Sequence, residues 1–229
     1  MEEAVMRLTE VATSSSTSTN EPQEPIAKKD ADETKPVPVI PEPVVEEEVN
    51  AVEQLLRKWE AEGSAFSQRE YAKGQVPEGD YIWLRKKGSG DGIVKQYGPA
   101  NLNLMTLRAH NFAYVKILPA ERVTQSSGNL IKVSAVLASK YPTALKLFCA
   151  RNDIDSWNFS GMYHIGLDIP AGVYRVKKKP NEDFGDLMWW KNIPGHQAEY
   201  RDELVRGTRD FKFIKGEFID IYDAFFEKK

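Results

Sequence analysis

The feature that most constrains the fold of this chain is an internal repeat. Residues 66–83 are echoed by residues 159–176, 93 positions further along when a one-residue gap is allowed. A second echo matches residues 128–140 with residues 216–228 at an offset of 88. Two echoes in the same order predict that one small unit occurs twice in the chain.

Each copy of the repeat contains a predicted turn that starts a strand. Pro77 and Pro170 fit the second position of a type I turn, and Gly79 and Gly172 fit its last position. Apolar and polar residues alternate on both sides of the second turn, as in strands with one solvated face. The turns therefore predict antiparallel β-structure in both copies.

A second β-pattern lies near the end of the chain. Residues 211–213 and residues 219–221 alternate around a turn at Lys215 and Gly216, which predicts a hairpin. We therefore expect an all-β dominated fold with two tandem units. Each unit is predicted to be a small antiparallel β-sandwich or a partly open barrel.

The repeat sets the predicted domain boundaries. The first β-rich repeat unit is placed at residues 64–140 and the second at residues 159–229. The connector at residues 141–158 continues an apolar run, and Pro142 suits the first position of a helix. The connector is predicted to hold either a short helix or another strand.

Residues 1–44 are predicted to be a disordered tether. Every residue from 13 to 19 is Ser or Thr, and six prolines lie among charged residues between positions 21 and 43. Residues 1–50 carry 12 acidic and 4 basic side chains, and the first aromatic residue of the chain is Trp59. Such a segment buries too little apolar surface to offset the entropy of ordering.

Residues 45–63 are predicted to form an amphipathic helix. Apolar side chains recur at spacings of three and four, namely Val45, Val49, Val52, Leu55, Leu56 and Trp59. Docking of this stripe on the β-core is one interpretation. The alternative is weak self-association through the Val45–Trp59 helix, although the pattern lasts barely two heptads.

Composition excludes several classes of function. Beyond residue 50 the net charge is +5, from 27 basic and 22 acidic residues that are interspersed, so no nucleic-acid surface is expected. The single cysteine, Cys149, permits neither an intrachain disulfide nor a Cys-based zinc site. We find no signal peptide and no run of about 20 apolar residues, so no membrane insertion is expected and a cytoplasmic location is the default.

The second turn resembles a family. Residues 166–176, which contain Asp168-Ile169-Pro170-Ala171-Gly172 and Tyr174, are similar to the "DIPAG-Y" units of bacterial proteins of unknown function, mostly Gram-positive. Proteins with such units are often tethered to the cell surface, so the resemblance implies an extracytoplasmic location. The first copy departs from the motif because Gln75 stands where the second copy has Asp168. The resemblance supplies no active-site residues.

No catalytic or metal-binding signature stands out. His110, His164 and His196 are too far apart in the sequence for a metal motif. The acidic residues between positions 182 and 186 lack the alternating pattern of a calcium loop, and no nucleophile elbow occurs. The sequence therefore predicts no metal, no cofactor and no catalytic residue.

One segment indicates a binding site. Residues 187–196, predicted to be a loop, contain two consecutive tryptophans, which cannot both face one core because neighbouring strand residues point to opposite faces. Either one ring caps the core from a loop, or an aromatic platform with at least one exposed ring binds a glycan or a protein. The candidate ligand-binding residues are Trp189, Trp190, Lys191, Asn192 and His196.

Three functions are consistent with this organisation. The leading hypothesis is a non-catalytic interaction or binding module on a flexible tether, at a cell surface or in a phage. The first alternative is a small enzyme or ligand carrier that uses the cleft between the two repeat units. The second is a cytoplasmic structural protein that assembles through a helix at residues 45–62.

Overall fold

The computed structural model of this protein describes residues 50–155, 158–196 and 198–229, which belong to one compact unit. The predicted tether at residues 1–44 lies outside the described residues, as do Val45 and Val49 of the predicted helix. Most of the secondary structure is β, as the sequence predicts, and three helices accompany the strands within the described ranges.

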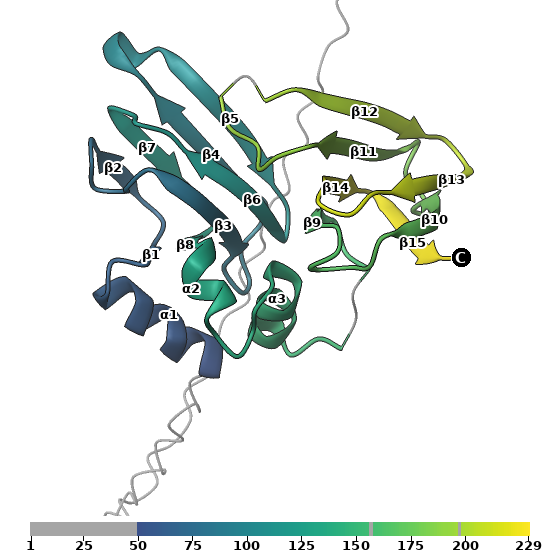
Figure 1. Ribbon diagram of the computed structural model, residues 1–229, viewed down its shortest axis with the longest axis horizontal. Coiled ribbons are helices and arrows are strands. Elements are labelled where there is room, and N and C mark those ends of the chain that lie inside the picture. Colours follow the sequence, from purple (N-terminus) through teal and green to yellow (C-terminus); the bar gives the residue numbers. More distant parts are fainter. Residues whose placement is uncertain (1–49, 156–157, 197) are drawn as a thin grey trace, which may run out of the picture. The chain divides into compact units, whose positions relative to one another are not determined.

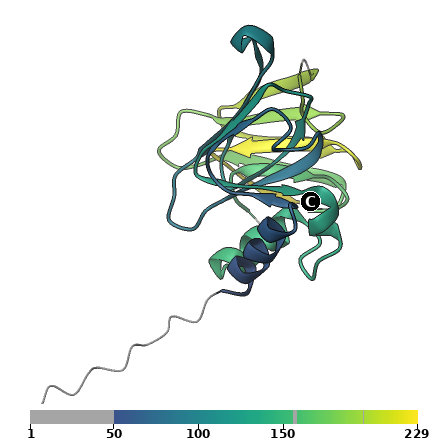
Figure 2. The same cartoon turned by 90° about the vertical axis from the view of Figure 1, so that its left-hand side faces the viewer.

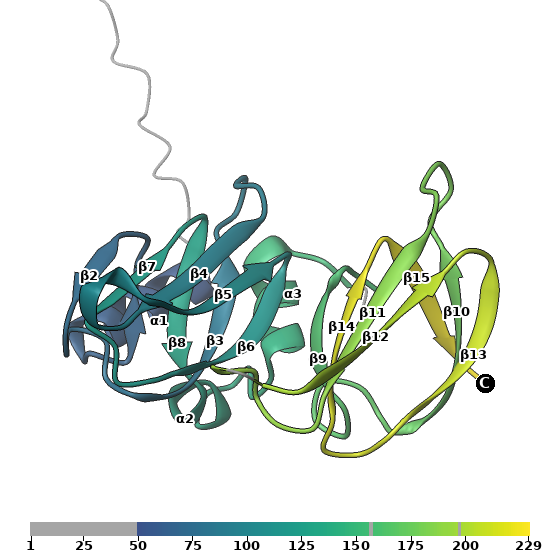
Figure 3. The ribbon, with the colours of Figure 1, turned by 90° about the horizontal axis from the view of Figure 1, so that it is seen from above.

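The strands form two groups, which we call the first and the second β-unit. The first β-unit contains β1 (Ala65–Phe66), β2 (Glu70–Ala72), β3 (Gly79–Arg85), β4 (Gly92–Tyr97), β5 (Asn103–Ala109), β6 (Phe112–Ile117), β7 (Arg122–Gln125) and β8 (Gly128–Lys132), with a 3-10 turn, η1 (Pro99–Asn101). The second contains β9 (Gly161–His164), β10 (Gly172–Lys178), β11 (Gly185–Trp190), β12 (Tyr200–Val205), β13 (Thr208–Phe213), β14 (Phe218–Tyr222) and β15 (Ala224–Lys228). Figure 3 shows the two groups side by side.

Each β-unit consists of two open antiparallel sheets. The strand orders in the first β-unit are β1-β8-β3-β6 and β2-β7-β4-β5. In the second β-unit they are β13-β10-β15 and β12-β11-β14-β9. The sandwich-like alternative is the one observed, and none of the described sheets closes into a barrel.

The two β-units share one strand order. When β2 to β8 are matched in turn with β9 to β15, every pairing of the first unit has a counterpart in the second, apart from that of β1. Gly79 pairs with Ile117, and Gly172, 93 residues after Gly79, pairs with Phe213, 96 residues after Ile117. The strand register therefore matches as well as the strand order.

The observed topology corrects two details of the predicted repeat. The echo at an offset of 88 aligns β8 with β14, whereas the counterpart of β8 is β15. Residues 211–213 and 219–221, predicted to form a hairpin, lie in β13 and β14, which belong to different sheets. Gly216, at φ 92°, turns the chain between the two sheets. Local alternation reveals strands but does not show which strands pair, because pairing depends on distant partners.

Three helices pack beside the first β-unit, namely α1 (Ala51–Ala61), α2 (Val133–Leu137) and α3 (Ala144–Asn152) (Figure 1). Helices α1 and α3 lie side by side below the strands (Figure 2). None of the helices within the described ranges is long and apolar enough to cross a membrane.

Helix α1 docks on the β-core through its apolar stripe. Val52, Leu56 and Trp59 are buried, and the Asn50 side chain caps the helix by accepting a hydrogen bond from the Val52 amide at 2.8 Å. A dimer seam would need the same three side chains. These three side chains are covered within the chain, so the docking interpretation accounts for them.

The connector holds helix α3 rather than a strand. Thr143 is the N-cap, and its hydroxyl accepts a hydrogen bond from the Lys146 amide at 3.0 Å. Pro142 therefore precedes the cap instead of occupying the first helical position. Helix α2, at residues 133–137, was not predicted, because the second echo implied a strand there.

Asp168 joins the two β-units. Its carboxylate accepts hydrogen bonds from the Tyr114 hydroxyl at 2.9 Å, the Leu145 amide at 3.0 Å and the His164 amide at 2.8 Å. Burial raises the pKa of Asp168, and these hydrogen bonds oppose the rise. Tyr114 belongs to β6, Leu145 to α3 and His164 to β9, so one side chain connects the first β-unit, a helix and the second β-unit.

Candidate functional site

All five predicted ligand-binding residues line one cavity of about 680 Å³, which we call the junction cavity. Two of its lining residues come from the first β-unit, Lys116 from β6 and Leu118 from the position just after it. The others come from β11, the loop after it, the start of β12 and the turn before β14. The structure thus brings together every residue that the sequence analysis selected.

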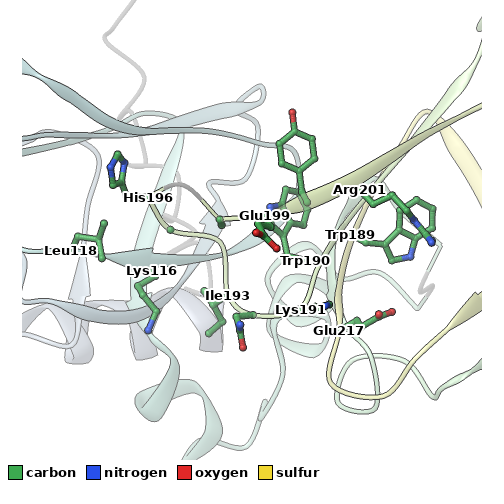
Figure 4. Close-up of a pocket in the computed structure, with 14 residues that line it drawn as sticks. Lys116, Leu118, Trp189, Trp190, Lys191, Ile193, His196, Glu199, Arg201 and Glu217 are labelled. Carbon is green, nitrogen blue, oxygen red and sulfur yellow. The ribbon is translucent and has the colours of Figure 1, made fainter.

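The junction cavity has two ends (Figure 4). Lys116, Leu118 and His196 lie at one end, and Trp189, Arg201 and Glu217 lie at the other. Trp190 and Glu199 lie between them. The volume of the cavity is within the range of small-molecule sites, about 300–1,000 Å³.

The two tryptophans lie in strand β11, not in a loop. Their rings point to opposite faces of the sheet, and only 5% of Trp189 and 7% of Trp190 is exposed. Trp189 packs against Phe211 of the other sheet, with ring centroids 5.6 Å apart. Of the two alternatives, the exposed platform of Trp189 and Trp190 is therefore wrong. Both rings are buried because the second β-unit is covered on both faces at this strand.

Tyr200 is the exposed aromatic side chain of the cavity. It is 61% exposed, and its ring centroid lies 6.0 Å from that of Trp190. Tyr200 follows the segment that the sequence analysis singled out. Its position in a polar strand gave no signal of a binding role.

The lining of the junction cavity carries both signs of charge. Arg201 stacks over the Trp189 ring at 4.3 Å from its centroid, and Lys191 is exposed. Glu199 and Glu217 supply the negative charge. Within the described ranges, none of these four side chains forms an ion pair with another residue. They are therefore available to a ligand.

The loop after β11 is fastened to the first β-unit. The Lys116 amide donates a hydrogen bond to the Pro194 carbonyl at 2.8 Å, and the His196 Nδ1 contacts the Leu104 carbonyl oxygen. His196 thus has a structural contact as well as a place in the cavity wall. The indole Nε1 of Trp189 is buried and has no hydrogen-bond partner among the described residues.

His110, His164 and Cys149 lie outside the junction cavity. His110 Nδ1 lies 3.0 Å from Asp91 Oδ2, and the His164 ring stacks on Phe218 at 4.4 Å. Burial lowers the pKa of His164 and raises the pKa of the Cys149 thiol. In the part of the chain that the structure describes, no three His, Cys, Asp or Glu side chains are placed to hold a metal ion.

No family model, curated protein or solved structure matches this chain.

Proposed function

We propose that this protein is a non-catalytic binding module whose ligand, a saccharide, occupies the junction cavity. The observation that carries the proposal is one cavity of about 680 Å³ in which the segment around Trp190 meets Lys116 of the first β-unit and Glu217. Such convergence is typical of ligand sites, which combine aromatic walls with a few polar groups.

The cavity walls suit a sugar ring. Sugars present apolar C–H faces that pack on aromatic rings and hydroxyls that both donate and accept hydrogen bonds. Tyr200 offers an exposed ring. Asn192, Lys191 and Glu199 offer an amide, an ammonium group and a carboxylate in the same cavity. Neither Ser, Thr nor Cys is among the described lining residues, so this part of the cavity wall offers no aliphatic hydroxyl or thiol nucleophile.

The rest of the sequence is consistent with a tethered module. Residues 1–50 carry a net charge of −8, and their Pro, Ser and Thr content is typical of spacers. The resemblance to DIPAG-Y units favours a bacterial surface as the place of action. We infer that the spacer separates the binding unit from whatever anchors it.

A second candidate function is saccharide hydrolysis. Two glutamates, Glu199 and Glu217, line the junction cavity, and most glycosidases use a pair of carboxylates. This candidate corresponds to an enzyme that uses the cleft between the units. It predicts that Glu199→Gln and Glu217→Gln abolish the release of reducing sugar while binding persists.

A glycan array followed by titration calorimetry tests the proposed function. We expect Tyr200→Ala and Lys191→Ala each to weaken binding about tenfold, because an aromatic contact or a charged hydrogen bond contributes about 1.4 kcal/mol. Phe225→Ala is the matched control, since Phe225 is a 44% exposed aromatic residue outside this cavity. An affinity that neither Tyr200→Ala nor Lys191→Ala changes would refute the proposal.

A further inference from the structure

The two β-units meet through the outer face of the sheet β12-β11-β14-β9. His110, which follows β5, stacks on Tyr222 of β14, with ring centroids 4.0 Å apart. Tyr114 of β6 contacts Phe218 of β14, with ring centroids 5.1 Å apart. Aromatic pairs thus join the two β-units, together with polar contacts such as the hydrogen bond from the Asn111 side chain to the Ser160 carbonyl at 2.7 Å.

Two carboxyl groups lie in the same face. Asp220 is only 3% exposed, and Asp186 is partly buried. One carboxylate oxygen of each, Oδ1, is buried and has no hydrogen-bond partner among the described residues. A buried carboxylate with one unpartnered oxygen favours its protonated form, because hydrogen bonds only partly replace the hydration that the charged form loses.

The groups that face the two acids come from both β-units. His110 and Asp91 belong to the first β-unit, and His110 Nδ1 lies 3.0 Å from Asp91 Oδ2. The charge of Asp202 in β12 adds to burial in raising the pKa of Asp186. Tyr222 lies two residues after Asp220, on the same face of β14. Burial raises the pKa of Tyr163 in the neighbouring strand β9, and the charge of Asp220 raises it as well.

These surroundings decide how the acids titrate. Burial raises the pKa of Asp220 to about 6, nearby Asp186 and Asp91 raise it as well, and His110 opposes the rise. Burial and the charge of Asp202 raise the pKa of Asp186. The matching positions in the first β-unit, 93 residues before Asp186 and 96 before Asp220, are Ile93 and Thr124, which do not titrate. The acidic pair is therefore specific to the face on which the units meet.

We propose that protonation of Asp220 and Asp186 tightens the contact between the two β-units, so that the junction cavity binds its ligand more tightly at pH 5 than at pH 7.5. The second half of this statement rests on the proposed function, and the first half does not. The sign follows from the raised pKa of each acid. The docked state binds protons that the separated or unfolded state has already released, so docking is favoured as the pH falls from about 7 toward 5.

Chemical denaturation of the full chain between pH 5.0 and pH 7.5 tests the proton linkage. For Asp220 alone, the unfolding equilibrium constant is expected to be about tenfold larger at pH 7.5 than at pH 5.0. Asp220→Asn removes this contribution, so the ratio between variant and native constants should change about tenfold across the range. Asp183→Asn, at an exposed acid in the preceding loop, is the control and should follow the native chain.

A second readout keeps the test independent of variant folding. Hydrogen-exchange protection factors of residues 110–116 and 160–164 in the native chain should be higher at pH 5.0 than at pH 7.5. Equal protection, or identical pH profiles for the native chain and Asp220→Asn, would overturn the linkage.

Ligand titrations at both pH values separate the two proposals. No saccharide binding at either pH, with pH-dependent protection intact, would refute the proposed function alone. Equal affinity at both pH values would refute the linkage between protonation and the cavity.

Discussion

At the scale of single residues, the two copies stabilise the turn before the central strand with different side chains. Asp168 accepts a hydrogen bond from the His164 amide, and Gln75, at the matching position, accepts one from the Ala72 amide at 2.9 Å. The departure of the first copy from the motif therefore preserves the local contact. Asp168 differs because it also holds Tyr114 and the N-terminus of α3.

Asp168→Ala is expected to destabilise the protein by about 3 kcal/mol. The substitution leaves the Tyr114 hydroxyl and the Leu145 amide without their acceptor in a partly buried place. Gln75→Ala, the control, loses one exposed hydrogen bond and should cost less than about 1 kcal/mol. Urea denaturation measures both values, and equal losses would show that Asp168 serves only its own turn.

The turns themselves could be predicted from single residues. Gly79 and Gly172 adopt φ values of 146° and 155°, which favour glycine. The hydroxyls of Tyr81 and Tyr174 each donate to the carbonyl of the turn proline, at 2.8 and 2.7 Å. The burial of Trp189 and Trp190 could not be predicted, because it requires knowing that both faces of β11 are covered.

At the scale of elements, the strands of the first β-unit pack tightly around the Trp83 ring. A Cβ atom added at Gly128 would lie 2.5 Å from Trp83 Cε2, and one at Gly92 would lie 2.1 Å from Trp83 Cζ2. The matching positions in the second β-unit are Val176 for Trp83 and Ala224 for Gly128. A smaller central residue and a larger neighbour thus replace the Trp–Gly pair.

Gly128→Ala is therefore expected to cost about 2–3 kcal/mol. The added methyl group would also meet the Leu84 carbonyl oxygen at 2.6 Å, and a close-packed core cannot yield that space. Gly207→Ala is the control, because nothing lies within 4 Å of the added atom. Thermal denaturation reports both, and a neutral Gly128→Ala would mean that Trp83 is loosely packed.

Helix α1 gives a separate test of docking against self-association. Leu56→Ala should destabilise the chain by about 3 kcal/mol, since Leu56 is buried within the same chain, and exposed Arg57→Ala should have little effect. Sedimentation velocity should show the native chain without a dimer formed through this helix. A concentration-dependent dimer that Leu56→Ala abolishes would contradict the docked arrangement.

Elements were predictable where periodicity is local. The alternation in β10, β13 and β14 and the apolar stripe of α1 all indicate the observed structure. The offset of the second echo was wrong because β8 and β14 have similar apolar patterns and yet different neighbours in the sheet. Strand β11 was mistaken for a loop, since a strand buried on both faces loses its alternation.

At the scale of the whole molecule, two units with one strand order and one register meet along a face that carries the junction cavity and the acidic pair. We propose that they arose by duplication and then diverged, since the positions that match Asp186, Asp220 and the tryptophans of β11 hold other residues in the first β-unit. The tandem layout was predictable from the repeat. The junction cavity could not be predicted, because Lys116 and Glu217 are distant in the sequence. Each is a polar residue whose local pattern gives no sign that it meets the other.

Deletion of residues 1–44 should leave the melting temperature within about 2 °C of the full chain. The deleted segment has no aromatic residue, and its Pro, Ser and charged content offers little to bury. Differential scanning calorimetry of both chains, at the same protein concentration, measures the difference. A drop of more than a few degrees would show that this segment packs on the β-units.

The location of the ligand is the most direct test of the central claim. Amide NMR spectra of the chain, recorded during titration with a saccharide selected on the array, report which residues contact the ligand. A saccharide in the junction cavity of about 680 Å³ is predicted to shift the amides of Lys116, Leu118, Glu217 and residues 189–193, 195–196 and 198–201. Shifts confined instead to Asn158, residues 175–177 and Phe225, around the smaller cavity of about 420 Å³, would contradict it.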